Sequence, residues 1–145
     1  MRGPMKHIFS LVLLSTVIIL GGCSRGDNGP TAKDYYKKAY QFIDAGYPNE
    51  AIDLLDIAIK KDPNYFDAYY NRGVVYYLMK NYRAAVDDLS KAISINPDSS
   101  AAYASRGEVY EIMNDREKAF KDYRRAARMG NKGAQDYLRS KNSSW

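Results

Sequence analysis

The stretch that decides the fold is residues 66–99, FDAYYNRGVVYYLMKNYRAAVDDLSKAISINPDS, because the same pattern of residue types stands thirty-four residues before it and thirty-four residues after it. Aromatic and small residues share the first half of the pattern, and small and apolar residues share the second half. The matched positions are Tyr35, Tyr69 and Tyr103; Ala39, Gly73 and Gly107; Phe42, Tyr76 and Tyr110; Ala51, Ala85 and Ala119; Leu55, Leu89 and Tyr123; Ala58, Ala92 and Ala126. A repeat of this length indicates an array of identical supersecondary units.

Each unit is predicted to be a helical hairpin. Spacings of four and seven residues place each set of matched positions on one face of an α-helix. The gap between the two sets leaves room for a turn near Gly46, near Asn81 and near Asn114-Asp115. Pro63 and Pro97 close the first two units, since proline denies a helix another turn. One hairpin cannot bury its apolar face alone, so the units are expected to stack.

At these positions the chain resembles the tetratricopeptide repeat family, with units at 32–65, 66–99 and 100–131. The resemblance implies an all-α fold, an α-solenoid of three helical hairpins plus a C-terminal capping helix. That helix is expected at 132–140, with Ala134, Tyr137 and Leu138 on one face, so that repeats and cap occupy 31–140 and 141–145 form a frayed tail. Two departures stand out: Asn131 replaces the closing proline, and a basic residue replaces the family's leucine, namely Lys38, Arg72 and Arg106. Their aliphatic stems are expected to cover apolar surface.

Residues 1–22 have the order of a secretion signal, with Arg2 and Lys6 ahead of an apolar stretch from Ile8 to Leu20 and small residues before Cys23. Met5 would open an equally good signal, so the true start at Met1 or Met5 stays open. The stretch is too short to span a bilayer comfortably. Leu20-Gly21-Gly22-Cys23 resembles the lipobox of bacterial lipoproteins. The alternative is an ordinary secretory signal or an inner-membrane anchor in which Cys23 is incidental.

The lipobox resemblance implies that the signal peptide is cut before Cys23 and that this cysteine carries covalent lipid such as diacylglycerol and palmitate. Residues 23–30 then form the lipidated cysteine and a flexible tether, which is rich in glycine and lacks apolar residues after Cys23. The expected location is the bacterial cell envelope, lipid-anchored. Because Ser24 follows the cysteine, the resemblance implies the periplasmic face of the outer membrane, with the inner membrane as the alternative.

No catalytic constellation is evident in the sequence. The only histidine, His7, lies in the segment to be removed, and Cys23 has no second cysteine to pair with. The adjacent acids Asp87 and Asp88 point to different sides of a helix. We therefore expect no enzyme, no metal site and no cofactor other than the lipid on Cys23. The mature net charge is +3, from 20 basic and 17 acidic residues, which does not favour nucleic-acid binding.

The family resemblance implies that the first helix of each unit lines a concave groove that binds a partner. Tyrosine offers large rigid contact area and asparagine can pair with a peptide backbone. The alternative is that tyrosine is simply frequent here, with fourteen in the chain. Repeats that hold acidic chaperone C-termini use basic and amide residues, and of the corresponding positions here only Asn71 fits. The predicted groove residues are Tyr36, Tyr40, Tyr70, Asn71, Tyr77 and Glu108.

A second surface is basic, because residues 116–145 hold nine Lys or Arg against three acids. The basic stripe, defined as Lys118, Lys121, Arg125 and Arg128, falls along one face of a helix and could rest on anionic headgroups. The alternative is an ordinary solvated face, partly paired through Glu117 and Lys121. Overall we expect a membrane-anchored adaptor that binds an envelope protein or peptide. The alternative is a structural lipoprotein that associates with itself as a homo-oligomer. The partner and the envelope process stay open.

Overall fold

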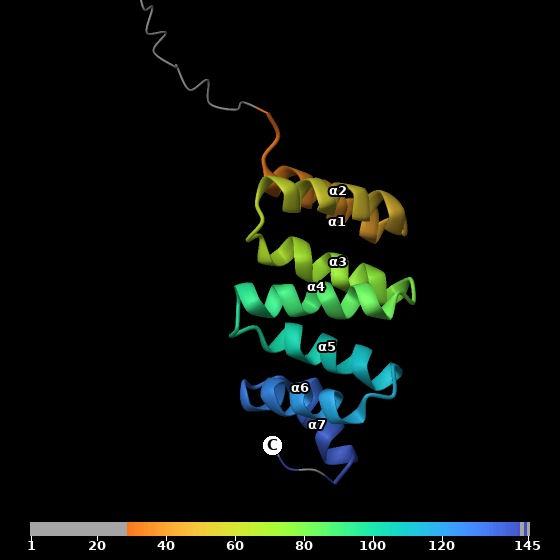
Figure 1. The fold of residues 1–145 in the computed structure, drawn as a ribbon, viewed down its shortest axis with the longest axis vertical. Coiled ribbons are helices and arrows are strands. Elements are labelled where there is room, and N and C mark those ends of the chain that lie inside the picture. The colour runs from red at the N-terminus through yellow and green to blue at the C-terminus, as the bar shows by residue number, and fades with distance from the viewer. Residues whose placement is uncertain (1–28, 143, 145) are drawn as a thin grey trace, which may run out of the picture.

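A computed structural model describes residues 29–142 and 144, and over this range the chain is a stack of helices. The helices are α1 (Ala32–Asp44), α2 (Pro48–Lys61), α3 (Phe66–Leu78), α4 (Tyr82–Ile95), α5 (Ser100–Ile112), α6 (Arg116–Arg128) and α7 (Lys132–Ser140). The first six helices form three antiparallel hairpins that follow one another along the long axis of the molecule, and α7 comes after them (Figure 1). The predicted all-α solenoid of three hairpins with a capping helix is confirmed.

The predicted signal peptide, Cys23 and the tether up to Asn28 lie outside the described residues. Within the described range, no helix has both the length and the apolar character that a membrane crossing requires.

Alanine and leucine at the matched positions form the core between the helices. Ala39, Leu55, Ala58 and Ala68 make one buried cluster in the first hairpin and its contact with the second. At the crossing of α3 and α4 a Cβ atom on Gly73 would lie 2.9 Å from Cγ of Leu89. The small residue at this position therefore lets the two helices of a hairpin approach closely.

The turn inside each hairpin uses one residue in the left-handed region, at the same place in every repeat. These residues are Gly46 (φ 79°), Lys80 (φ 64°) and Asn114 (φ 59°). The turn predicted near Asn81 is present, but Lys80 takes the left-handed conformation, and Asn81 is the N-cap of α4, where its side chain accepts a hydrogen bond from the Ala84 N–H. A lysine carries no local signal for a left-handed conformation, so the sequence could not place it.

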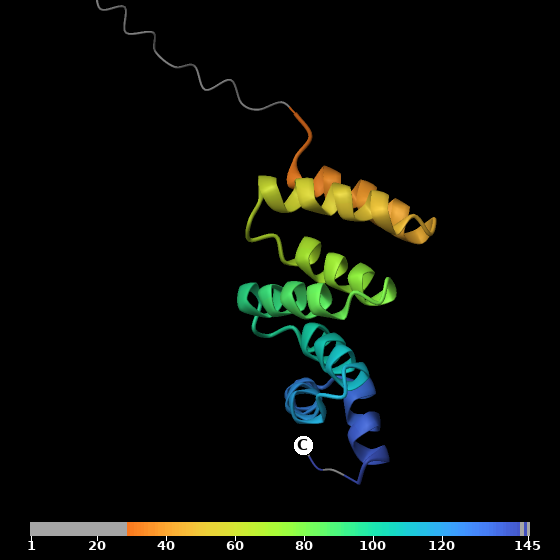
Figure 2. The same cartoon turned by 45° about the vertical axis from the view of Figure 1, so that its right-hand side comes forward.

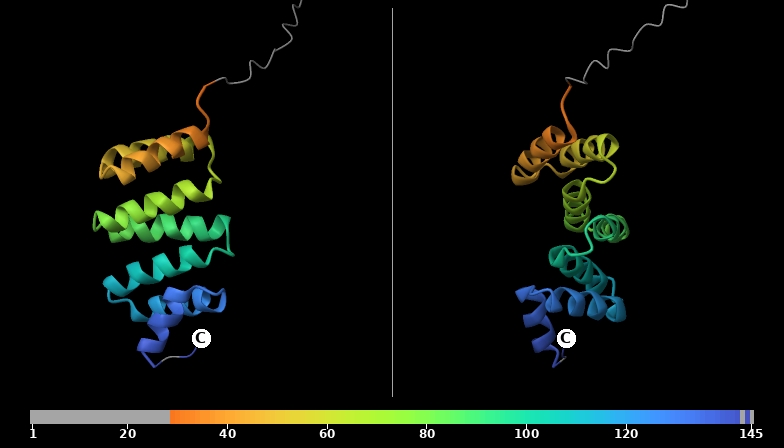
Figure 3. Two further views of the ribbon diagram at one scale, coloured as in Figure 1. Left: turned by 180° about the vertical axis from the view of Figure 1, so that it is seen from behind. Right: turned by 90° about the vertical axis from the view of Figure 1, so that its left-hand side faces the viewer.

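The capping helix α7 explains why Asn131 replaces proline. The Asn131 side chain accepts a hydrogen bond of 2.9 Å from the Ala134 N–H, so it caps α7 in a way that proline could not. Ala134 and Leu138 are buried against α6, as predicted. Seen from the side, α7 points more nearly along the long axis of the array, whereas the helices before it lie across that axis (Figures 2 and 3). It therefore covers the last hairpin without continuing the stack.

The basic residues at the leucine position do more than cover apolar surface. Arg106 donates from Nε and Nη2 to the two carboxylate oxygens of Asp122, at 2.7 and 2.9 Å, and from Nη1 to Oγ of Ser90 at 2.9 Å. Asp122 is buried, with 5% of its side chain exposed. The guanidinium also lies over the rings of Tyr103 and Tyr110. The Arg106 side chain therefore connects α5 and α6 of the third repeat to α4 of the second repeat.

The second repeat contains the same arrangement. Arg72 forms two hydrogen bonds of 2.7 Å to Asp88 and a further one to Asp56 in the preceding repeat. The hydrogen bonds that Arg72 donates to the Asp88 carboxylate raise the pKa of Arg72, with burial opposing. Sequence reasoning missed these partners, although the arginine and aspartate stand sixteen residues apart in both repeats. The first repeat has Lys38 and Leu54 at these positions and lacks the pair.

Candidate functional site

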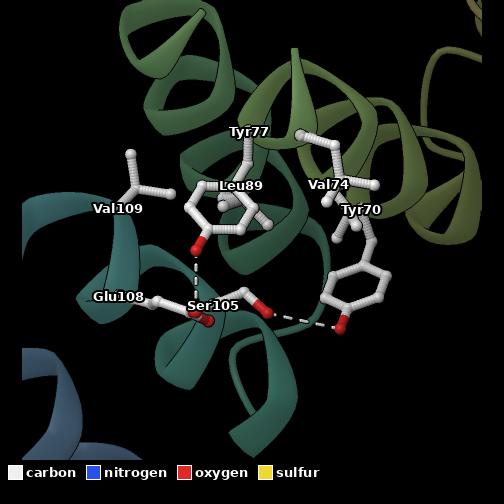
Figure 4. Close-up of a pocket in the computed structure, with 8 residues that line it drawn as sticks. Tyr70, Val74, Tyr77, Leu89, Ser105, Glu108 and Val109 are labelled. Carbon is white, nitrogen blue, oxygen red and sulfur yellow. Dashed lines mark hydrogen bonds between the residues drawn. The ribbon is translucent and has the colours of Figure 1, made fainter. Parts of the chain in front are cut away.

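The six predicted groove residues lie on α1, α3 and α5, the first helices of the three hairpins. Hydrogen bonds between side chains connect these helices in order. The Nδ2 of Asn71 donates to the Tyr36 hydroxyl at 3.2 Å, which joins α3 to α1. The hydroxyls of Tyr70 and Ser105 lie 3.3 Å apart, and the Tyr77 hydroxyl donates to Glu108 at 2.8 Å, which joins α3 to α5 (Figure 4). The structure thus brings five of the six together in contacts between repeats.

Tyr40 is the sixth predicted residue, and no contact between repeats is described for it. Its side chain is 48% exposed near the middle of α1. Tyr40 is therefore accessible to a partner on the same helix as Tyr36.

A cavity of about 160 Å³ opens between α3, α4 and α5 beside these hydrogen bonds. Leu78 lines it and is 65% exposed, the largest exposure among the large apolar side chains of the described residues. The lining side chains are shown in Figure 4 and are Tyr70, Val74, Tyr77, Leu78, Leu89, Ser105, Glu108 and Val109. The cavity therefore offers both an apolar floor and hydroxyl and carboxylate groups.

Hydrogen bonds fix which groups act as donors or acceptors at Tyr77 in this cavity and at Asn71 elsewhere in the groove. The hydrogen bond to Glu108, helped by burial, raises the pKa of Tyr77 to about 12, so its hydroxyl stays a donor at neutral pH. The Nδ2 of Asn71 donates to both Tyr36 and the Asp67 carbonyl, at 3.2 and 2.8 Å. Its Oδ1 then remains as an acceptor that could receive a peptide N–H.

The sequence had separated core tyrosines from groove tyrosines more sharply than the structure does. Tyr69 and Tyr76 hold matched core positions, whereas Tyr70 and Tyr77 were assigned to the groove, yet all four are half-buried. Tyr70, Tyr76 and Tyr77 all pack against the buried cluster of Ala85, Leu89 and Val109. The reason is that side chains in a thin stack of helices reach the core from both of its faces.

A second cavity, of about 420 Å³, lies where α5, α6 and α7 meet. The Glu111 carboxylate accepts hydrogen bonds from the Tyr137 hydroxyl at 2.8 Å and the Tyr123 hydroxyl at 3.3 Å. Burial, followed by this hydrogen bond, raises the pKa of Tyr137 to about 12. We refer to it as the C-terminal cavity, and its lining is Ala104, Ser105, Glu108, Glu111, Tyr123, Asn131, Gly133, Ala134 and Tyr137.

Sequence reasoning counted Glu111 among the residues of the third repeat that line the groove, but it did not place Tyr137 in a site. A signal for Tyr137 was present, because it stands thirty-four residues after Tyr103 and continues the series of matched aromatics. Its role differs from that of the earlier members, since its ring packs 4.1 Å from the ring of Tyr123 and its hydroxyl reaches α5. The changed direction of α7 produces this contact, and periodicity along the chain does not reveal it.

All four residues of the basic stripe are exposed on α6. Lys118 donates to Asp115 at 2.6 Å, so the acid that pairs with the stripe in the described structure is Asp115 and not Glu117. Arg125 lies over the ring of Tyr103 at 5.8 Å. The stripe is a solvated face with some local pairing. In the described part of the chain, no group of three or more His, Cys, Asp or Glu could hold a metal ion.

Comparisons with known proteins agree with this geometry. Three sequence models match the chain, "Tetratricopeptide repeat" at residues 66–99 and again at 100–129, and "TPR repeat" at 39–80. Among curated protein sequences, none matches the chain.

Solved structures share the fold. The first TPR of Spaghetti (RPAP3), solved with an HSP90 peptide SRMEEVD, has a TM-score of 0.72 at 28% identity and covers 76% of this chain and 89% of that chain. The first TPR domain of human RPAP3 gives a TM-score of 0.71 at 28% identity, over 76% and 88%. A crystal structure of MamA gives 0.66 at 34% identity over 72% of this chain and 57% of that one, so the chain spans little more than half of MamA.

Proposed function

Because the chain belongs to the tetratricopeptide repeat family, we propose that it is a non-catalytic adaptor that binds a segment of a partner protein in its concave groove. The observation that carries the proposal is the row of hydrogen bonds between α1, α3 and α5. These bonds hold the tyrosine side chains in place before any partner arrives. A preorganised surface loses less conformational entropy on binding, and tyrosine is enriched among residues that dominate binding energy.

The fold supports the same conclusion. The similar RPAP3 domain is described as bound to an HSP90 peptide, so a stack of this shape can hold a peptide. Here the groove provides exposed Tyr40 and Leu78, an apolar cavity of about 160 Å³, and a free acceptor on Asn71. These are the features that an extended peptide needs: apolar side-chain contacts and a partner for its backbone.

We further propose that this adaptor is a lipoprotein of the bacterial cell envelope, held on the periplasmic face of the outer membrane by lipid on Cys23. The support is the lipobox resemblance of Leu20 to Cys23 and the short polar stretch that follows it. Two or more acyl chains would hold the protein firmly, because each buried methylene adds about 0.8 kcal/mol. The partner would then be an envelope protein or peptide within reach of the membrane.

Photocrosslinking in intact cells tests the groove. A benzophenone amino acid is placed at Tyr40 or Leu78 in the groove, and as a matched control at Ile57, which is 37% exposed on α2. We expect the two groove positions to give the same adduct and Ile57 to give none. Adducts at Ile57 alone, or the same adduct at all three positions, would contradict a groove-bound partner.

The anchor is tested separately with Cys23→Ala. Intact mass spectrometry of the parent protein is expected to show a chain that begins at Cys23 and carries acyl groups, whereas the variant accumulates as uncut precursor. An unmodified cysteine in the parent protein, or cleavage at another bond, would overturn the anchor without affecting the groove.

A second candidate function is structural self-association. The observation that favours it is the charge contrast within the third repeat, which has Glu108 exposed in the groove and the basic stripe exposed on α6. Two copies could pair these surfaces. Light scattering on purified protein at increasing salt distinguishes the candidates, because such a complex would dissociate as salt screens the charges.

A further inference from the structure

Glu108 and Glu111 stand nearly one turn apart on α5, and both line the C-terminal cavity. Their hydrogen-bond partners are tyrosine hydroxyls, with Tyr77 donating to Glu108 and with Tyr123 and Tyr137 donating to Glu111. A hydroxyl is neutral, so these bonds leave both negative charges uncompensated.

Several carboxylates elsewhere in the described structure form ion pairs with arginine or lysine. Asp56 and Asp88 pair with Arg72, Asp122 with Arg106, Asp115 with Lys118, and Asp136 with Arg139. No such pair is found for Glu108 or Glu111 within the described residues. Arg116 and Lys141 border an adjoining cavity that also touches Glu111, and neither forms an ion pair with it.

The chain itself shows which side chain suits such surroundings. Arg106 lies over the rings of Tyr103 and Tyr110 and forms two hydrogen bonds with Asp122. The C-terminal cavity offers a similar set of groups to a side chain from outside, namely two carboxylates and the ring of Tyr137, which packs on the buried ring of Tyr123. A guanidinium or ammonium group combines attraction to aromatic rings with charge-assisted hydrogen bonds to carboxylates.

We propose that the C-terminal cavity receives an arginine or lysine side chain from the bound partner, so that the groove selects extended segments carrying a basic residue. The inference rests on the proposed function, since it names the class of segment that the groove binds. It also separates this protein from the similar RPAP3 domain, whose peptide SRMEEVD is acidic on balance, with three acidic residues against one arginine. An acidic side chain entering this cavity would meet two like charges.

Binding to peptide pools tests the inference on the full chain in detergent. Each pool contains fluorescent nonapeptides with neutral ends that are randomised except at one fixed position, which is Arg, Lys, Gln or Glu. Anisotropy reports the affinity, and the Glu pools serve as the acidic reference. We expect Arg and Lys pools to bind about tenfold more tightly than Glu pools, and the preference to weaken as salt rises.

Glu108→Gln with Glu111→Gln removes the charges while keeping the shape of both side chains. We expect this variant to reduce the preference for basic pools to about twofold or less. Glu50→Gln with Glu117→Gln, two exposed residues on α2 and α6, makes the same change in net charge outside the groove and should keep the preference. If the double groove variant is destabilised, Glu108→Gln alone serves as the test, because Glu108 is exposed and its replacement should not affect folding. This single variant must still lower the preference for basic pools.

The outcomes separate this inference from the proposed function. Pools that bind equally whatever their charge, or Glu pools that bind best, would overturn the basic-residue inference and leave the groove adaptor standing. A preference that persists in the double groove variant would overturn it too. If no pool binds, both proposals fail. The double groove variant keeps its basic stripe and can be added in excess as a competitor. If it displaces the Arg pools from the parent protein, and the same variant with the stripe mutated does not, the occupant is a second copy and the partner-segment inference is wrong.

Discussion

The first repeat and the two repeats after it are all helical hairpins. They differ, among other places, at three corresponding positions that affect packing and the turn. At the leucine position of the family, the first repeat has Lys38 where the others have Arg72 and Arg106. At the helix crossing it has Ala39 where the others have glycine. At the left-handed turn residue it has Gly46 where the others have Lys80 and Asn114. The shared pattern specifies a hairpin, whereas these differences decide how each hairpin is joined to its neighbours and how much strain its turn carries.

The largest expected effect concerns the ion pair that the first repeat lacks. Asp122→Ala would leave the guanidinium of Arg106 half-buried and without its carboxylate, which typically costs about 3 to 5 kcal/mol. Lys38→Ala, at the corresponding exposed position of the first repeat, should change the free energy of unfolding little. Urea denaturation of the full chain measures both. Equal effects would show that the repeats do not differ here in the way the structure indicates.

An intermediate effect is expected at the helix crossing. A Cβ on Gly73 would lie 2.9 Å from Cγ of the buried Leu89, whereas on Gly107 it would lie 3.3 Å from the ring of Tyr123. Overpacking costs about 1 to 3 kcal/mol, and alanine returns up to about 1 kcal/mol through helix propensity. Gly73→Ala should therefore lower the melting temperature and Gly107→Ala should leave it nearly unchanged. The reverse order would contradict the packing at these crossings.

The smallest effect is expected at the left-handed turn residue. Lys80 has φ 64° without the freedom of glycine, so Lys80→Gly should raise the free energy of unfolding by about 0.5 to 1 kcal/mol. Asn114→Gly should give less, because asparagine tolerates this conformation better. Thermal melts of the two variants check the order. A loss of stability in Lys80→Gly would mean that the lysine side chain contributes contacts that outweigh its strain.

Much of the fold followed from the sequence because helical periodicity is a local property. The spacing of thirty-four residues between Tyr35, Tyr69 and Tyr103 predicted the repeated hairpins. The apolar residues Ala134 and Leu138 predicted which face of the capping helix is buried. The groove face could be predicted in the same way, since residues on one face of a first helix share a register. Five of the six predicted residues do make contacts between repeats.

By itself the sequence determined the number of repeats, because the pattern recurs every thirty-four residues, and it determined the helices and the face that each presents, because spacings of four and seven residues specify one face of a helix. Only the tertiary structure decided which polar side chains meet. Arg106 finds Asp122 sixteen residues away and Tyr137 finds Glu111 twenty-six residues away, across helices whose crossing no periodicity specifies. The C-terminal cavity exists because α7 departs from the direction of the stack, and that direction results from the packing of Ala134 and Leu138 on α6 together with the capping turn at Asn131.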